Sequence, residues 1–270
     1  MQFRKIYKSK ILVSIMKLNI PIKGNEKLKQ ILEKVKKNKQ LETYLECSNI
    51  TAIDRLGIND HGPIHVTIVA NIALKMLRNL IAAGLKTGIE KNYSFTKDDA
   101  EVVVILAAIL HDIGHVVHRE QHTQYSITLA IPILRELLSG VYDERKATII
   151  TAEVLHAIAS HHRGYKPLTL EGGILSIADA LDMKKGRARI PFEAGMVTIH
   201  SVSALAIENV EISSGDKPVI IKIKMSNSSG IFQIDNLLKP KLKDSGLEEY
   251  IQISAEIKGE EKKILESFEL

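Results

Sequence analysis

The sequence predicts a mainly α-helical protein that ends in a small α/β module. Through most of the first 190 or so residues, apolar side chains recur three and four positions apart, as on the buried face of a helix. From about residue 197, β-branched residues gather instead in short runs, with turn signals such as SSGDK and NSSG. We therefore expect three parts: an N-terminal arm and amphipathic helix over 1–46, a helical domain over 47–193, and a small α/β domain over 194–270.

The helical part is expected to begin with an amphipathic helix over 25–46. Its apolar stripe consists of Leu28, Ile31, Leu32 and Val35. A second helix is predicted over 64–80, because apolar residues there also repeat at helical spacing. His65 lies on the apolar stripe of this second helix, where a histidine is either a hydrogen-bonded core residue or a ligand.

A third helix is expected to start at Thr96, which forms the pattern of an N-cap with Asp99 three residues later. The run DAEVVVILAAIL that follows is apolar on nearly every side. It predicts a buried helix that ends at His111 and Asp112. Further helices are expected over 122–138, 146–162 and 172–184.

Three β-strands are expected in the C-terminal part, within 198–212, 217–226 and 248–257. Each of these runs is rich in β-branched residues. Between the second and third strands, residues 231–246 predict a short helix that Pro240 interrupts. The C-terminal part is therefore expected to be a small sheet with one helical connection.

The composition restricts the kinds of function that the chain can have. Cys47 is the only cysteine, which excludes an internal disulfide and a thiolate cluster and favours a reducing cytoplasm. Any metal must then be held by imidazole and carboxylate groups. The sequence contains no run of eighteen apolar residues, so we expect no membrane association.

The net charge of +5 depends mainly on the N-terminus, because residues 1–15 hold four basic residues and no acid. Nucleic-acid binding is therefore not expected from the overall charge. Two interpretations of this segment are open: Met16 is the true start of the chain, or the segment forms a short edge strand or arm. A homodimer formed through the C-terminal part or the basic N-terminal helix is a further expectation.

Four histidines, at 111, 115, 118 and 122, occur in the segment HDIGHVVHREQH. Three interpretations compete: a protonatable face on one helix, hydrogen-bonded core histidines, or part of a metal site. On an unbroken helix the first and last would stand roughly 16 Å apart, too far for one ion because metal–nitrogen bonds are about 2 Å long. A compact site requires a break. We expect it at Gly114, in the left-handed conformation that glycine commonly adopts just beyond a helix.

The rest of the chain contains further residues of the kinds that bind metals. Asp179 occurs in ILSIADALDM, where a carboxylate flanked by apolar residues needs a partner to stay ionised. His161 and His162 end another expected helix and, being adjacent, point in different directions. The candidate metal ligands are His65, His111, Asp112, His122, His161, His162 and Asp179. This donor set suffices for two divalent ions. It favours Mn, Fe, Co or Ni over calcium, with Mg and Zn as alternatives.

The order of His65, then His111–Asp112, then Asp179 resembles the HD superfamily of metal-dependent phosphohydrolases. HDIGH at 111–115 is similar to the HDIGK of the dinuclear, HD-GYP-like branch, whose best-known members hydrolyse cyclic dinucleotides. Three further segments resemble ligand-bearing segments of that branch: HTQYS, SHHRGYKPL and ILSIADALDMKKGRARIPF. The likeness covers about residues 50–193, so it implies a helical HD-domain core there.

The resemblance implies a phosphohydrolase whose partner is a phosphorylated small molecule, a phosphomonoester or phosphodiester, with nucleotides first among them. In the implied mechanism, Asp112 bridges two ions that activate the attacking water. His115 stands where the branch has lysine, and it stabilises the phosphate, protonates the leaving group, or orients a ligand. The expected substrate contacts are His61, His118, Lys185, Arg187 and Arg189. Two alternatives stay open: an HD-type di-iron oxygenase, and a regulatory or scaffold protein with a structural metal site.

Overall fold

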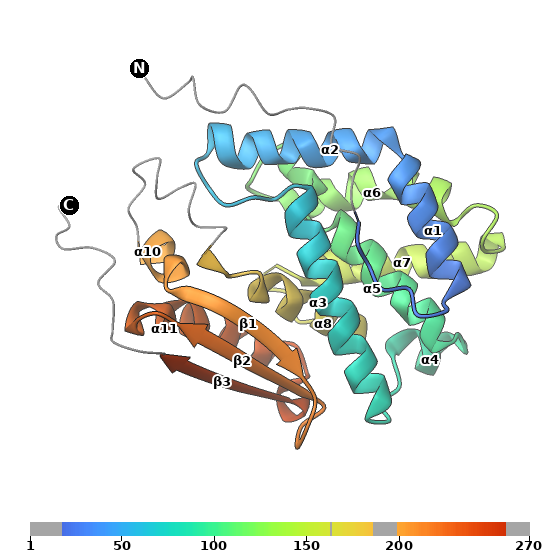
Figure 1. The fold of residues 1–270 in the computed structure, drawn as a ribbon. Helices are drawn as coiled ribbons and strands as arrows, with labels where there is room; N and C mark the ends of the chain where they lie inside the picture. The colour runs from blue at the N-terminus through green and yellow to red at the C-terminus, as the bar shows by residue number, and fades with distance from the viewer. Residues whose placement is uncertain (1–17, 163, 186–198, 258–270) are drawn as a thin grey trace.

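The computed structural model describes residues 18–162, 164–185 and 199–257. A helical body lies beside a small three-stranded sheet that has its own short helices (Figure 1). The predicted fold class, mainly helical with a small β-containing module at the C-terminal side, is confirmed. The boundary expected at 46/47 falls inside a helix. The boundary at 193/194 and the N-terminal arm with Met16 lie outside the described residues.

Two helices occupy the segment for which the sequence predicts a single amphipathic helix. Helix α1 spans Glu26–Lys37, helix α2 spans Lys39–Asn49, and a π-helical turn over Ile50–Arg55 continues α2. Asn38 separates the two helices, because its backbone is extended and its side-chain oxygen accepts a hydrogen bond from the Leu41 amide at 2.8 Å. The apolar spacing resumes directly after Asn38, so periodicity alone does not reveal the break.

Helices α3 (Pro63–Ala82) and α5 (Lys97–Leu110) pack against each other in the middle of the helical body. All residues of α5 from Asp99 to Leu110 are buried, as its all-round apolar sequence predicts. Thr96 and Asp99 form the expected capping box at its start. A short helix for which no prediction was made, α4 (Gly88–Tyr93), lies between α3 and α5 in the chain.

Three longer helices complete the body: α6 (His122–Leu138), α7 (Glu144–Ser160) and α8 (Leu170–Leu181). Their bounds agree with the predicted ranges to within three residues at each end. Helices α7 and α8 both pack against α5, and α6 packs against α7. The buried helix α5 therefore contacts three of the helices that carry or directly precede candidate ligands, α3, α7 and α8.

Within the described part of the chain, α3 is the one helix whose length and composition would allow it to cross a membrane. Half of its most apolar stretch, 50%, is buried inside the protein. The helix packs against α5 and α8. The core helix of a folded domain has the same length and composition, so this helix is only weak evidence for a membrane span.

The C-terminal module contains the strands β1 (Ile207–Ser213), β2 (Val219–Met225) and β3 (Ile251–Ile257). Strands β1 and β2 pair antiparallel, and β3 lies parallel to β2 at its other side. Parallel strands need a crossover connection. Here it is a helical segment made of α11 (Ile231–Gln233), a π-helical turn, and α12 (Lys239–Asp244).

Two details of the predicted module are wrong. Residues Ile199–Leu205 form helix α10 instead of the first half of a strand. β-Branched residues prefer strands only weakly, and packing overrides that preference here. Pro240 does not interrupt the helical connection, because it lies in the first turn of α12, where a missing N–H leaves no hydrogen bond unmade.

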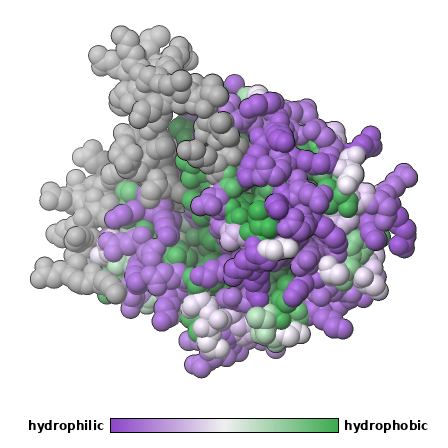
Figure 2. Space-filling view, turned by 45° about the vertical axis from the view of Figure 1, so that its right-hand side comes forward, coloured by the Kyte–Doolittle hydropathy of each residue, from purple (hydrophilic) through white to green (hydrophobic). Residues whose placement is uncertain are grey.

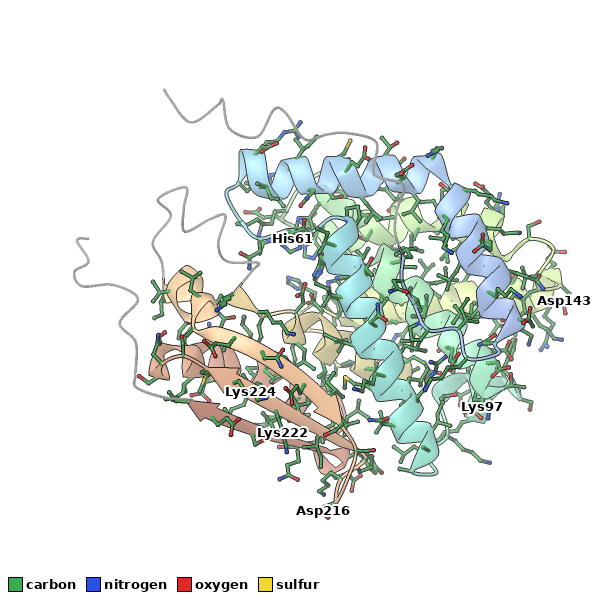
Figure 3. All side chains as sticks on the ribbon, viewed as in Figure 1. His61, Lys97, Asp143, Asp216, Lys222 and Lys224 are labelled. Carbon is green, nitrogen blue, oxygen red and sulfur yellow. The ribbon has the colours of Figure 1, made fainter. Side chains whose placement is uncertain are left out.

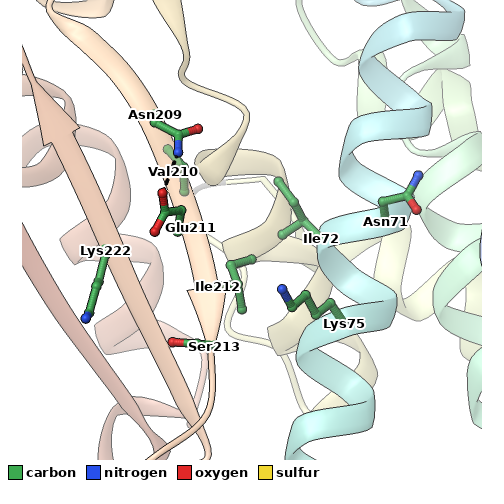
Figure 4. A pocket seen from close by; sticks show the side chains of 9 residues that line it. All are labelled: Asn71, Ile72, Lys75, Asn209, Val210, Glu211, Ile212, Ser213 and Lys222. Atoms are coloured by element: carbon green, nitrogen blue, oxygen red, sulfur yellow. Dashed lines mark hydrogen bonds between the residues drawn. The ribbon is translucent and has the colours of Figure 1, made fainter.

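The surface in Figure 2 is mainly hydrophilic, with hydrophobic side chains gathered toward the middle of the face. A groove of about 670 Å³ lies between α3 and β1 (Figure 4). Ile72 and Lys75 of α3 face Val210 and Ile212 of β1 across it. None of the candidate metal ligands lines this groove, so the site lies elsewhere.

Candidate metal centre

The helix is interrupted within the histidine-rich segment, as a compact site requires, but the interruption does not depend on a left-handed Gly114. After α5 a 3-10 turn follows over Ile113–Val116, and α6 begins at His122. Gly114 does not have the positive φ predicted for it. It allows close approach instead, because a Cβ there would lie 2.0 Å from the carbonyl oxygen of His122 and 2.5 Å from the amide of Ser126. The missing side chain thus lets the turn pack onto α6, which brings His122 to Asp112.

The carboxylate of Asp112 is buried at the centre of the cluster, and each of its oxygens faces a different set of histidines. Oδ2 lies 2.7 Å from Nδ1 of His61, 3.3 Å from Nε2 of His65 and 3.4 Å from Nε2 of His111. Oδ1 lies 3.5 Å from Nε2 of His122, 3.7 Å from Nε2 of His115 and 3.8 Å from Nε2 of His161. Figure 3 shows His61 beside the start of α3.

Asp179, near the end of α8, completes the set around Oδ2. Its Oδ1 lies 3.4 Å from Nε2 of His65 and 3.7 Å from Nε2 of His111. Its Oδ2 accepts a hydrogen bond from Nζ of Lys241 at 2.7 Å. We call His65, His111, Asp112 and Asp179 the first group. We call Asp112, His115, His122 and His161 the second group.

The ring orientation of these histidines is fixed through their Nδ1 atoms. Nδ1 of His111, His122 and His161 donates to the backbone carbonyl three residues earlier, at 2.9, 2.9 and 2.6 Å. Nδ1 of His65 lies 2.7 Å from Oδ2 of Asp182. A proton on Nδ1 leaves the lone pair of Nε2 directed into the cluster, which is the arrangement of metal-binding histidines.

The first group carries negative charge. Burial alone would raise the pKa of Asp112 and Asp179. However, His111 and His61 beside Asp112, and Lys241 beside Asp179, hold both pKa values well below the ordinary range. Burial likewise opposes protonation of His111, but the two carboxylates raise its pKa to about 9. A proton on Nε2 of His111 therefore offsets part of the charge of the two aspartates, and a bound cation would displace this proton and take over its role.

The second group contains neutral imidazoles. Burial lowers the pKa of His115 to about 3, and it also lowers the pKa values of His122 and His161, against the opposing effect of Asp112. The ring of His115 stacks between those of His61 and His122, at centroid distances of 4.4 and 4.3 Å. Within the described part of the chain, neither ring nitrogen of His115 has a hydrogen-bond partner. Neutral imidazole is the form that binds metals.

These side chains fit divalent metal ions. Among the described residues, four overlapping sets of three side chains have their donor atoms within 4.8 Å of one another. Burying ionised carboxylates costs free energy, and so does burying an imidazole whose ring nitrogens have no hydrogen-bond partner, as in His115. A bound metal ion would compensate both costs. The first group would hold one ion and the second group another, with Asp112 shared between them.

Six of the seven candidate ligands meet in this cluster, and His162 lies at its edge. His162 is exposed, and its ring centroid lies 5.5 Å from that of His122 and 6.4 Å from that of His161. Of the expected substrate contacts, His61 touches Asp112, whereas His118 and Lys185 are exposed. Arg187 and Arg189 lie outside the described residues. The roles of all these residues stay predictions.

Two residues outside the predicted set of metal ligands and substrate contacts touch the cluster. Asp182 follows α8 and orients His65. Its position one turn after Asp179 predicts such an orienting role in preference to metal binding. Lys241 reaches Asp179 from the C-terminal module. Its segment, KPKLKD, looks like any exposed lysine-rich stretch, so no local signal marks it.

The helical fold and the buried histidine–aspartate cluster define a class of metal-dependent hydrolases. The family model described as "HD domain" matches residues 63–184, which include both groups. The chain is similar to the uncharacterized protein MJ1020 of Methanocaldococcus jannaschii. The two are 46% identical over 233 residues, which cover 86% of this chain and 90% of that protein. The chain therefore belongs to the HD-domain family.

Proposed function

We propose that the protein is a phosphohydrolase that cleaves a phosphomonoester or phosphodiester with two divalent ions, one at each group. The proposal depends on the carboxylate of Asp112, whose two oxygens face separate sets of histidines. One carboxylate in that position can bind two ions at once, as in dinuclear hydrolases. The mixture of imidazole and carboxylate donors favours Mn, Fe, Co or Ni. This would place the protein in the dinuclear branch of the family.

Divalent ions bound at such sites lower the pKa of a coordinated water and neutralise the phosphoryl oxygens of a substrate. Asp112 and Asp179 supply the negative charge that holds cations. The hydrogen bonds of the Nδ1 atoms keep the histidine rings aligned before substrate binds. His115 lies buried between the rings of His61 and His122, and as a neutral imidazole it can donate an N–H hydrogen bond to the phosphate.

His61 is the substrate contact that we favour. Its side chain is 16% exposed, whereas that of His65 is fully buried at 0%. His61 therefore contacts both Asp112 and the solvent from which a substrate arrives. Nucleotides are the substrates to test first, because the segments HDIGH and SHHRGYKPL resemble those of nucleotide-cleaving relatives.

The test combines metal analysis of the purified full-length protein with an assay of nucleotides and a generic chromogenic phosphodiester. We expect about two ions per chain, and release of phosphate or nucleotide that a chelator abolishes. Asp112→Ala should remove both the metal and the activity. Asp216→Ala changes an exposed aspartate in the turn between β1 and β2 and should affect neither.

Other outcomes would favour the alternatives. Bound iron and oxygen consumption without phosphate release would indicate a di-iron oxygenase of the HD type. Bound metal without turnover of any substrate in the panel would indicate a regulatory or scaffold protein with a structural metal site. In both cases the hydrolase proposal would be wrong.

A further inference from the structure

One positively charged side chain reaches the metal centre from outside the helical body. Lys241, on α12 of the C-terminal module, donates a hydrogen bond to Oδ2 of Asp179 at 2.7 Å. The two side chains are only 13% and 22% exposed. The other oxygen of Asp179 faces the histidines of the first group. A single carboxylate therefore separates the ammonium group from the proposed ion.

A small cavity lies beside this pair, where the end of α8 meets the C-terminal module. Its volume is about 140 Å³, and both parts of the protein contribute to its walls. Its polar lining residues are Asn59, Asp179, Asp182, Gln233 and Lys241. Pockets that hold a whole small ligand usually measure about 300–1,000 Å³. This cavity therefore suits one polar group of a larger ligand.

The cavity offers an anion one cationic donor, the ammonium group of Lys241. Lys241 is the only basic residue among the described residues that line it. A lysine ammonium group has three N–H donors. Because Asp179 accepts one of them, Lys241 can donate to an anion without leaving the aspartate. The two acidic residues in the walls are themselves paired, Asp179 with Lys241 and Asp182 with His65.

We propose that Lys241 binds the phosphoryl group of the substrate in this cavity, next to the first group. The inference rests on the proposed phosphohydrolase function and adds a substrate-binding residue to it. It also assigns a role to the C-terminal module. Because four of the nine lining residues, Lys241 among them, belong to the module, substrate binding requires the module to be docked against α8.

A different role for Lys241 would be to orient Asp179 as a metal ligand and nothing more. The two roles differ in the quantity that changes when the positive charge is removed. A lysine that binds the substrate contributes to the affinity for phosphate. A lysine that only orients Asp179 contributes to the affinity for metal.

The test is a calorimetric titration of inorganic phosphate into the full-length protein loaded with Mn²⁺. Lys241→Gln removes the charge, Lys241→Arg retains it, and Lys243→Gln removes an exposed lysine of the same helix as a matched control. We expect Lys241→Gln to weaken phosphate binding about tenfold, the magnitude of one charge-assisted hydrogen bond. Lys241→Arg should retain most of the affinity, and Lys243→Gln should retain all of it.

The Mn²⁺ content and the thermal midpoint, measured on the same samples, should equal those of the wild type. If Lys241→Gln does not fold, Lys241→Met keeps the aliphatic stem and replaces it in the test. The inference is overturned if the neutral variant binds phosphate as the wild type does, if it loses Mn²⁺ in parallel, or if the wild type binds no phosphate. If phosphate binding depends on Lys241 but no phosphoester is hydrolysed, the result would support the subsite and refute the proposed function.

Discussion

Nδ1 of His65 lies 2.7 Å from Oδ2 of Asp182, although 117 residues separate the two in the sequence. Nε2 of the same ring faces Asp112 and Asp179. A carboxylate on Nδ1 fixes the orientation of an imidazole and makes its other nitrogen a stronger donor to a metal. Asp182 is therefore expected to act on the first group through His65.

Replacing Asp182 by alanine should weaken metal binding at the first group on the order of 10- to 100-fold, because His65 loses its orienting partner. The affinity can be measured by competition with a chelator. Asp182→Asn keeps an oxygen acceptor for Nδ1 of His65, so its metal affinity should fall less than that of Asp182→Ala. Asp216→Ala serves as the control. An unchanged affinity in Asp182→Ala would show that the orientation of His65 does not depend on this hydrogen bond.

Replacing Gly114 by alanine should lower the free energy of unfolding by about 1–3 kcal/mol, the usual cost of overpacking. The new Cβ would lie 2.0 Å from the carbonyl oxygen of His122, so the 3-10 turn and α6 would have to separate. Urea denaturation measures the change. In the control Gly215→Ala, the added Cβ meets only the flexible end of Ile220, at 2.8 Å. Equal stability of the two variants would contradict the close-approach role of Gly114.

Removing metal with a chelator should lower the thermal midpoint. An ion that binds only the folded chain stabilises it by about 2.7 kcal/mol when its concentration is a hundred times its Kd. Scanning calorimetry with and without chelator measures this effect. Asp112→Ala, which lacks the shared ligand, should unfold at the same temperature in both conditions. A wild type that does not respond to the chelator would mean that the cluster holds no metal under those conditions.

Asp99 should make the stability of the protein depend on pH. Burial alone would raise its pKa, but hydrogen bonds from Lys27, Thr96 and Tyr142 lower it below the ordinary value. A depressed pKa in the folded state means that the stabilisation is present above about pH 4, where an unperturbed aspartate is ionised. It is lost as the pH falls through the folded-state pKa.

Asp99→Asn should accordingly be less stable than the wild type at neutral pH, and the difference should shrink in acid. Urea denaturation of both proteins at neutral pH and below about pH 4 measures the two differences. A difference that does not change with pH would show that Asp99 stabilises the chain through packing and capping and not through its charge.

The positions of the helices could be predicted because they depend on local spacing and on capping residues. The range of α6 is predicted to the residue, and the capping box of Thr96 and Asp99 marks the start of α5. Predictions that needed more than local spacing were less accurate. The break at Asn38 depends on the N-cap that its side chain forms, and helix α10 depends on packing against other elements; an apolar periodicity contains neither.

By itself the sequence determined the helical class, the buried helix α5, and the kinds and order of the residues that could bind metal. Only the tertiary structure decided that each oxygen of Asp112 faces its own set of histidines, that His162 lies exposed at the edge of the cluster, and that Lys241 reaches Asp179. The physical reason is that a repeat of apolar residues specifies which face of a helix is buried. It does not specify which residue of a distant element will lie against that face.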